Sequence, residues 1–320
     1  MAEWTSPGEA ARILRAGGIV AIPTETVYGL AGNAFNVHAL ARIFEAKNRP
    51  TFDPLILHIA ALDEVETLAS EFPPLARALA EKFWPGPLTM VLPKRSSVPD
   101  LATSSLPTAA IRFPSHPVAQ QVIRLAGVPL AAPSANLFKH VSPTTAEHVA
   151  EQLAGKIDGI VDGGPCKVGV ESTIVSFATE IPTLLRPGAV TLEMLRETLG
   201  EVRVHNSSSA PGKVQAPGML DTHYRPKVPL FYGAPPRGAR LPERTARLAF
   251  GKTQGAVPET LNLSKAGDLL EATANLYAQM HELDRAEFSL ILVDQIPEVG
   301  LGRALNDRLR RASVKEWPFT

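Results

Sequence analysis

The sequence predicts an α/β protein with a mixed sheet, followed by a second and smaller α/β domain. Up to residue 204, helical patterns alternate with short apolar runs bounded by Gly or Pro. Some of these runs follow one another without an intervening helix, which favours a mixed sheet over a regular βαβ winding. A stretch rich in Ser, Pro and Gly then interrupts the pattern, which resumes after it. We therefore expect domains at 1–204 and 228–320, joined by a flexible linker at 205–227.

The first element shows the signals from which the helices are predicted. Ser6 is a good N-cap and Pro7 suits the first helical position. Glu9 completes a capping box, and Gly17-Gly18 ends the helix, after which a strand follows at 19–22. The same signals predict further helices at 37–47 (capped by Asn36), 74–83, 117–126 and 145–153.

Short apolar runs predict the remaining strands of the first domain. They lie at 55–60, 88–93, 109–114, 128–133, 159–164 and 172–177. The second domain is predicted to contain strands at 228–233, 247–251 and 288–297, with helices at 268–285 and 303–312.

Composition excludes several classes of protein. Hydrophobic residues make up 45% and charged residues 20% of the 320 residues, which excludes a disordered tail, a collagen-like fibre and a membrane bundle. Lys plus Arg and Asp plus Glu both number 32, so no net field would hold a long nucleic acid, and strong direct nucleic-acid binding is not expected. The single cysteine, Cys166, excludes a disulfide framework or a thiolate zinc site and fits a reducing cytosol. With no signal-peptide or membrane-span pattern, we expect a cytoplasmic protein.

Familiar catalytic motifs are absent or incomplete. The segment 250–253 (FGKT) resembles the end of a phosphate-binding P-loop, but the first glycine would fall at Ala246, inside an apparent strand. The segment 300–305 (GLGRAL) lacks the third glycine of a dinucleotide fingerprint. The sequence contains no HExxH or GxSxG, and its eight histidines lack metal-ligand spacing. Hydrolase and zinc functions are therefore disfavoured.

Polar residues gather instead just after predicted strands, where ligands bind in open α/β sheets. The loop 23–32 (PTETVYGLAG) carries Thr24, Thr26 and Tyr28, which either present hydroxyls to a polar ligand or simply cap a short helix. Lys47 and Arg49 stand at a helix end, where the ordinary interpretation is a solvated C-terminus.

Charged or polar residues also interrupt two predicted strands. His58 taken alone is more typical of a satisfied core residue. Arg112 is costly in a strand unless it is paired or faces a ligand, and we favour a carboxylate or phosphate ligand. Further polar clusters follow at 132–136, 142–144, 171–173 and 186–188. Together these clusters favour an anionic nucleotide plus a small carboxylate as ligands.

The motifs PTETVYGL, KNRP, PLILH, AAIRFP, PSAN, ESTIV and RPG, in this order, resemble the YrdC-like catalytic domain of threonylcarbamoyl-AMP synthases. The segments PGMLDTHYRP and ALNDRLRRAS resemble the longer, two-domain form of that family. The resemblance implies a YrdC-like twisted mixed sheet with flanking helices and a Rossmann-like C-terminal domain. It also implies a nucleotidyltransferase that converts L-threonine, bicarbonate and ATP into L-threonylcarbamoyladenylate and pyrophosphate. A separate transferase would then modify tRNA.

The resemblance also implies roles for individual residues. The threonine site would consist of Thr24, Thr26, Tyr28, His58, Arg112, Ala132 (through its backbone) and Ser172. The ATP site would consist of Lys47, Arg49, Asp53, Thr108, Ser134, Asn136, Ser142, Arg186 and Tyr224. Lys47, Arg49 and Arg186 would be the catalytic residues, assisted by Mg²⁺ that arrives with ATP. No organic cofactor and no resident metal site are expected.

The chain departs from the family pattern at two places. Asp53 stands where the family usually has Asn, so a carboxylate near the triphosphate would need compensation. Leu220-Asp221-Thr222 replace the basic residues that often follow PGM in the linker. Because the resemblance brings Tyr224 to the nucleotide, we expect residues 211–226 to fold over the site as a lid when ATP and threonine are bound.

Two other functions remain as alternatives. An RNA-binding module would use a basic surface, but the sequence has no aromatic RNP-like strand or lysine-rich stripe. The second alternative is a carbamoyltransferase of the same fold. Related domains occur in proteins that also carry Cys-rich zinc segments and an acylphosphatase-like domain, and this sequence contains neither. No residue pattern identifies a general base.

Overall fold

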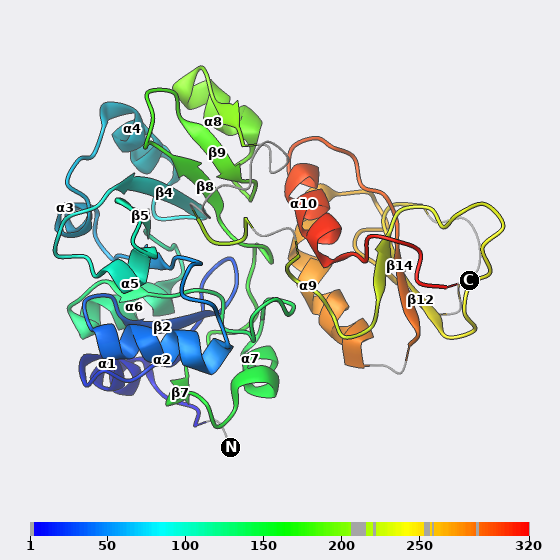
Figure 1. The fold of residues 1–320 in the computed structure, drawn as a ribbon, viewed down its shortest axis with the longest axis horizontal. Coiled ribbons are helices and arrows are strands. Elements are labelled where there is room, and N and C mark those ends of the chain that lie inside the picture. The colour runs from blue at the N-terminus through cyan, green and yellow to red at the C-terminus, as the bar shows by residue number, and fades with distance from the viewer. Residues whose placement is uncertain are drawn as a thin grey trace.

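The computed structural model describes residues 3–205, 216–219, 222–252, 257, 259–285 and 288–319. Within these ranges the chain forms two sheets, each with its own helices (Figure 1). The larger sheet is built from strands up to Val204, and the smaller from strands that begin at Leu230.

The larger sheet is mixed, as the sequence predicted. In the described residues its strand order is β10-β9-β8-β4-β5-β3-β6-β2-β1-β7. The central strand β3 pairs parallel with β5 and antiparallel with β6, and β4 pairs antiparallel with β5 and parallel with β8. The strands are β1 (Val20–Ile22), β2 (Gly29–Asn33), β3 (Ile56–His58), β4 (Leu88–Pro93), β5 (Thr108–Arg112), β6 (Leu130–Ala131), β7 (Gly159–Ile160), β8 (Thr173–Ser176), β9 (Thr183–Arg186) and β10 (Arg203–Val204).

The five helices predicted for the first part all form, and each begins within one residue of the expected start. Ser6 Oγ accepts a hydrogen bond from the backbone of Glu9 at 3.2 Å, and Asn36 and Thr145 cap their helices in the same way. The Glu9 carboxylate pairs with Arg12 on the next turn. The helices are α1 (Pro7–Arg15), α2 (Val37–Lys47), η1 (Leu62–Glu64), α3 (Val65–Leu68), α4 (Pro74–Phe83), α5 (Asp100–Thr103), α6 (Pro117–Ala126), α7 (Ala146–Leu153) and α8 (Leu192–Leu199).

The sequence prediction missed several elements. Residues 23–32 were predicted as a loop, but their second half forms β2, which pairs antiparallel with β1 and β6. The burial of both faces leaves no polar alternation in Gly29–Asn33, so the usual strand signal is missing. Helix α8 was also not predicted, although Thr191 caps it by accepting from the backbone of Met194.

Helices cover both faces of the larger sheet. Along β1, Ala21 packs into the core shared with α2, α4 and α7, whereas Val20 and Ile22 pack into the core shared with α1 and α6. Leu57 on β3 is fully buried in the first of these cores. This two-sided covering fixes the sheet and leaves the loops at its strand ends to form a site.

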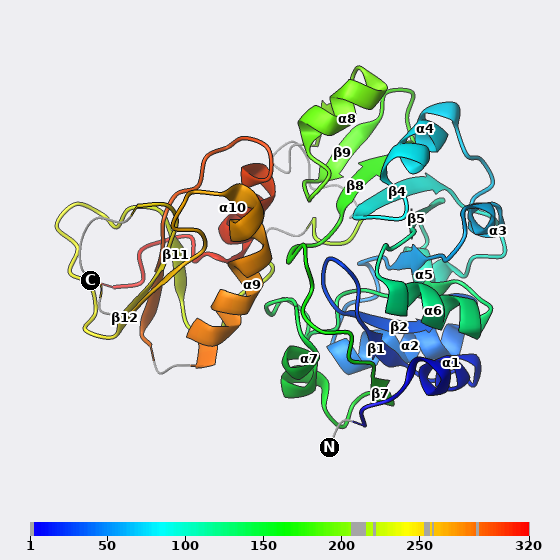
Figure 2. The same cartoon turned by 180° about the vertical axis from the view of Figure 1, so that it is seen from behind.

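The smaller sheet is parallel, with strand order β11-β14-β12-β13 in the described residues. Its strands are β11 (Leu230–Tyr232), β12 (Thr245–Ala249), β13 (Glu259–Asn262) and β14 (Leu290–Val293), and its helices are α9 (Leu269–Arg285) and α10 (Gly302–Ala312). Strand β13 was not predicted. Both views place α9 and α10 on the side of this sheet that faces the larger sheet (Figures 1 and 2). In the described residues, no helix is long and apolar enough to cross a membrane.

The position of Leu57 leads to a test of the packing. Leu57→Ala removes a fully buried side chain at the centre of the larger sheet, so we expect a loss of about 2–5 kcal/mol in the free energy of unfolding, measured by urea denaturation. Leu125→Ala is the matched control, because Leu125 is 45% exposed on α6 and should change stability little. Equal losses in both variants would contradict this account of the core.

Candidate functional site

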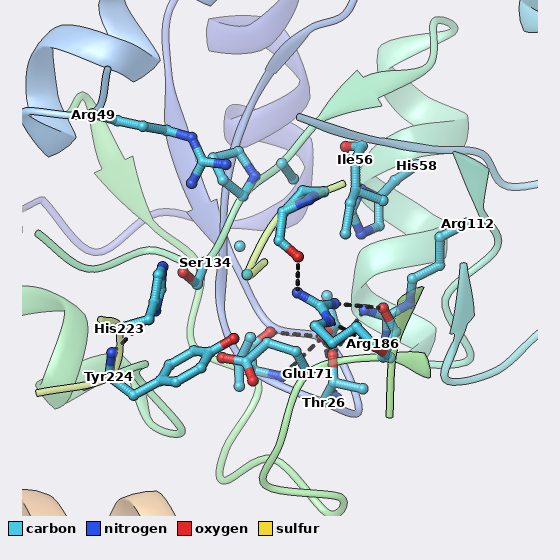
Figure 3. Close-up of a pocket in the computed structure, with 18 residues that line it drawn as sticks. Thr26, Arg49, Ile56, His58, Arg112, Ser134, Glu171, Arg186, His223 and Tyr224 are labelled. Carbon is cyan, nitrogen blue, oxygen red and sulfur yellow. Dashed lines mark hydrogen bonds between the residues drawn. The ribbon is translucent and has the colours of Figure 1, made fainter. Parts of the chain in front are cut away.

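One pocket collects most of the polar clusters found in the sequence (Figure 3). Its walls come from the loop between β1 and β2, the end of α2, strands β3 and β5, the loop after β6, the start of β8 and the end of β9. Pro217, Gly218, His223 and Tyr224 complete it from the linker. The residues that line it are Thr24, Thr26, Val27, Gly29, Arg49, Ile56, His58, Arg112, Ala132, Pro133, Ser134, Glu171, Ser172, Arg186, Pro217, Gly218, His223 and Tyr224.

Arg112 lies on one side of the pocket and carries a buried charge. Its Nη2 is 2.6 Å from Glu25 Oε1, and its Nη1 donates to Thr26 Oγ1 at 2.8 Å. Its Nε is buried and has no hydrogen-bond partner among the described residues. The guanidinium is therefore partly compensated by Glu25 and retains an unused donor. Sequence reasoning missed Glu25, although this residue stands between the two threonines of PTETVYGL.

The two threonines do different things. Thr24 Oγ1 donates to the carbonyl of Val27 at 2.6 Å and accepts from the backbone N–H groups of Thr26 and Val27, so it holds its own turn. Thr26 instead contacts Arg112. Tyr28 does not line the pocket. Its hydroxyl donates to the carbonyl of Gly164 at 2.8 Å, within the core.

His58 faces the pocket from β3 and is buried. One ring nitrogen, Nδ1, lies 3.1 Å from the carbonyl oxygen of Ile56. Burial, together with the nearby charge of Arg112, lowers the pKa of His58 to about 3. The imidazole is therefore neutral at pH 7 and can accept or donate a hydrogen bond without adding charge to the pocket.

Arg49 lies at the opposite side of the view from Arg112 and His58 (Figure 3). It is buried, donates to the carbonyl oxygens of Asp53 and Pro54, and lies 3.0 Å from the Asp53 carboxylate. Burial raises the pKa of Asp53, and the charge of Arg49 opposes that rise. Asp53 does not line the pocket, and its carboxylate faces Arg49 instead.

Lys47 also lies outside the pocket lining. Its Nζ donates to the carbonyl oxygens of Ser134 and Asn136, which flank the turn after β6. Burial, together with the nearby Arg49, lowers the pKa of Lys47 well below its ordinary value. In this arrangement Lys47 holds the segment that presents Ser134 to the pocket.

Arg186 at the end of β9 joins the pocket to the start of β8. Its Nε donates to the carbonyl of Ser172 at 3.1 Å, its Nη2 to Ser172 Oγ at 3.2 Å, and its Nη1 to the carbonyl of Pro217 at 3.1 Å. Among the described residues it has no carboxylate within ion-pair distance. Arg186 therefore brings to the pocket a guanidinium with no ion-pair partner of its own, and the charge of Glu171, which pairs with Arg308, offsets it only in part. Such a group suits an anionic ligand.

Three further residues predicted for the site lie outside the pocket lining. Asn136 donates from its side chain to the carbonyl oxygens of Leu137 and His140, and its buried Oδ1 has no hydrogen-bond partner in the described part of the chain. Ser142 Oγ donates to Glu171 at 2.5 Å. Thr108 begins β5, opposite Pro93. Residues 206–215, 220 and 221 of the expected linker and lid lie outside the described residues.

Comparisons with known proteins identify the family. Residues 12–188 match the Sua5, YciO and YrdC family model, described as "Telomere recombination", and residues 190–314 match "Threonylcarbamoyl-AMP synthase, C-terminal domain". The threonylcarbamoyl-AMP synthase of Pyrococcus abyssi is 43% identical, covering 95% of this chain and 93% of the relative. The chain belongs to the threonylcarbamoyl-AMP synthase family.

Two further matches agree with this assignment. The threonylcarbamoyl-AMP synthase of Bacillus subtilis is 42% identical, covering 95% of this chain and 92% of the relative. The crystal structure of Pyrococcus abyssi Sua5 complexed with L-threonine superposes with a TM-score of 0.89 at 40% identity, covering 96% of this chain and 94% of the other. The family and fold class expected from the motifs are confirmed, and the protein is a transferase-type enzyme.

The low pKa of His58 predicts how stability depends on pH. Below pH 6.5 the unfolded chain binds a proton at this histidine, whereas the folded chain does not until about pH 3. Stability should therefore fall as the pH falls below 6.5. His58→Asn removes this titration, so we expect its loss of unfolding free energy between pH 6.5 and pH 4.5 to be smaller than the parent's by about 2 kcal/mol.

Urea denaturation at each pH measures this difference. His38→Asn, which replaces an exposed histidine on α2, provides the control. A pH dependence that is identical in the parent and in His58→Asn would show that His58 does not titrate on unfolding.

Proposed function

We propose that this enzyme forms L-threonylcarbamoyladenylate and pyrophosphate from L-threonine, bicarbonate and ATP. The observation that carries the proposal is the pocket itself, which gathers Arg49, Arg112 and Arg186 with the hydroxyls of Ser134 and Ser172 in one enclosure. Such a set matches one carboxylate and one polyphosphate in a single site. Family membership supplies the identity of the reaction.

In this proposal, threonine binds on the side of Arg112 and His58. Arg112 receives the threonine carboxylate through its unused Nε, while Glu25 and Thr26 hold the guanidinium in place. Ser172, the backbone at Ala132 and neutral His58 provide further polar groups for the substrate, and Thr24 shapes the turn. The relative from Pyrococcus abyssi was crystallised with L-threonine, which supports this class of substrate.

ATP binds on the side of Arg49, Ser134 and Tyr224. Arg49 and Arg186 face the phosphates, and Lys47 acts by fixing the Ser134 segment. Asn136 and Ser142 support the same wall through their contacts with neighbouring backbone and with Glu171. Neither Asp53 nor Thr108 contacts the pocket as it stands, so we assign them no direct contact with ATP.

The reaction needs no covalent enzyme intermediate. The threonine amine combines with bicarbonate to give a carbamate and water. A carbamate oxygen then forms a bond to the α-phosphorus of ATP while the bond to the β-phosphate breaks and pyrophosphate leaves. Charge that develops on the phosphate oxygens is stabilised by the fixed guanidinium groups of Arg49 and Arg186. Mg²⁺ enters as part of the ATP substrate.

The product is a mixed anhydride and therefore an activated donor of its threonylcarbamoyl group. A further enzyme would transfer this group to tRNA. A cytoplasmic location fits that role. Of the alternatives, an RNA-binding module is less well supported, because basic and acidic residues are equal in number. A carbamoyltransferase is less well supported because the chain has a single cysteine.

The decisive experiment measures pyrophosphate release from ATP with L-threonine and bicarbonate present together or omitted singly. We expect release only when both are present. Release that depends on neither would eliminate the proposed reaction.

Arg112 provides a test of the threonine site. Arg112→Ala removes the partner of the carboxylate, so we expect threonine affinity measured by calorimetry to fall by about 2–4 kcal/mol, with ATP affinity little changed. Because this change strands the buried Glu25 carboxylate, the double variant Glu25→Gln/Arg112→Ala is measured beside it. Threonine affinity equal to that of the parent in a folded variant would make Arg112 a structural residue.

Arg49 provides a test of the nucleotide site. The double variant Arg49→Gln/Asp53→Asn removes the charge without leaving a buried carboxylate. We expect kcat to fall by about 100-fold, because the charge acts on the developing transition state, and threonine affinity to stay near the parent's. Steady-state kinetics and calorimetry measure the two quantities, and an unchanged kcat would assign Arg49 to packing alone.

A further inference from the structure

We propose that Arg308 and Tyr277, on the helices of the smaller sheet, are positioning residues for the nucleotide half of the active site. The inference rests on the proposed function and extends it, because it assigns the C-terminal helices an indirect part in binding ATP, through Glu171 and Tyr224. Four observations support it, concerning Arg308, Glu171, Tyr224 and the cost of burying this network.

Arg308 reaches from α10 to the two segments that carry Ser172 and Arg186. Its side chain is fully buried, and its Nε donates to Glu171 Oε2 at 2.8 Å. Its Nη1 donates to the carbonyl of Pro187 at 2.9 Å, one residue beyond Arg186. One guanidinium from the second part of the chain thus ties the start of β8 to the end of β9 just behind the pocket.

Glu171 lines the pocket, but both of its carboxylate oxygens are already engaged. Oε2 accepts from Arg308 and from the Tyr277 hydroxyl at 2.9 Å, and Oε1 accepts from Ser142 Oγ at 2.5 Å. Burial favours a higher pKa, but the charges of Arg308 and Arg186 and the bond from Ser142 outweigh it and lower the pKa of Glu171 to about 2. Glu171 therefore stays ionised, and its carboxylate connects the two parts of the chain through its bonds to Arg308, Tyr277 and Ser142.

The same two residues hold Tyr224. The Arg308 guanidinium carbon is 5.4 Å from the centre of the Tyr224 ring, and the Tyr277 and Tyr224 ring centres are 5.7 Å apart. Tyr224 has a φ of 61°, which a bulky residue rarely adopts unless its surroundings hold it. Its buried hydroxyl lines the pocket without a hydrogen-bond partner among the described residues, so it is available to a ligand.

Stability alone does not explain this arrangement. Taking a carboxylate and a guanidinium out of water costs about as much as their attraction returns, and an apolar set of the same volume would hold two domains together as well. The polar network differs from an apolar one in that hydrogen bonds and ion pairs fix the orientation of the side chains. It fixes the orientation of Glu171, the Ser142 hydroxyl and the Tyr224 ring with respect to the pocket.

The test compares Arg308→Gln, Arg308→Lys and Tyr277→Phe with Arg310→Gln as the control. Arg310 is on the same helix, but its side chain is 58% exposed and pairs with Glu298 at the surface. Steady-state pyrophosphate release gives KM for ATP and KM for threonine separately, and thermal denaturation reports stability.

We expect KM for ATP to rise about tenfold or more in Arg308→Gln and about threefold in Tyr277→Phe, with Arg308→Lys in between. KM for threonine should rise by a smaller factor than KM for ATP in each variant, because Ser172 is the one group assigned to threonine that lies beside Glu171, and Arg310→Gln should leave both constants unchanged. An unchanged KM for ATP in Arg308→Lys and Tyr277→Phe would overturn the inference, as would equal rises in both constants.

If Arg308→Gln fails to fold, the other two variants decide the question. Failure of the proposed reaction is distinguishable from failure of this inference. If the parent protein releases no pyrophosphate in response to threonine and bicarbonate, ATP affinity measured by calorimetry replaces KM in the same comparison. Parent-like ATP affinity in all folded variants would then overturn the inference.

Discussion

The structure depends on keeping several guanidinium groups charged inside one buried pocket. Each of these groups loses hydration, and the loss must be balanced by carboxylates, carbonyl oxygens or a ligand. Arg112 is balanced by Glu25 and Arg49 by Asp53. Arg186 has only carbonyl and hydroxyl acceptors among the described residues. The pocket is thus compensated by ion pairs at Arg112 and Arg49, whereas Arg186 has no ion pair and is offset only in part by Glu171, which pairs with Arg308. A guanidinium of this kind favours an anionic ligand.

The same contacts also connect the segments that surround the site. Glu25 belongs to the turn between β1 and β2, so its pair with Arg112 ties this turn to the end of β5. Arg49 and Asp53 both lie between α2 and β3, so their pair braces that segment internally. Lys47 connects the end of α2 to the turn after β6 through two carbonyl oxygens instead of a carboxylate. Charged side chains that are bonded to the surrounding loops are positioned by them, which is what the alignment of two substrates requires.

Local signals in the sequence predicted much of the fold, because helix caps and strand ends depend on residues only a few positions apart in the chain. The bounds of α2, α4 and α6 follow from Asn36, Pro74 and Pro117, and a mixed sheet follows from strands without intervening helices. Strand β2 could not be found in this way, because a Gly- and Ala-rich segment buried on both faces shows no alternation. Its pairing with β1 and β6 depends on contacts distant in sequence.

For the site, the sequence predicted where the polar residues meet but not how their charges are paired. That polar clusters after strands would meet in one place follows from α/β topology, and the structure brings Arg49, Arg112 and Arg186 together. The pairing of carboxylates with guanidinium groups depends on distances in the folded chain, and the spacing of residues along the sequence does not reveal these distances. Glu25, the partner of Arg112, was missed for this reason. The reaction came from resemblance, because a pocket for a carboxylate and a polyphosphate fits many reactions.

The contacts across the two sheets bear on how such a chain is best divided. The residues after the linker form a separate unit if the chain is divided by its sheets and its apolar cores. They have their own sheet and their own apolar cluster around Leu230, Leu248 and Ile291. Yet that cluster also includes Tyr224, which lines the pocket, and α10 places Arg308 against Glu171. A unit that buries a charged side chain against its neighbour just behind the pocket is held in the orientation that pairs this charge, because another orientation would leave it unpaired. The ion pair between Arg308 and Glu171 therefore favours one arrangement of the two parts of the chain, and it does so beside the pocket that binds the ligands.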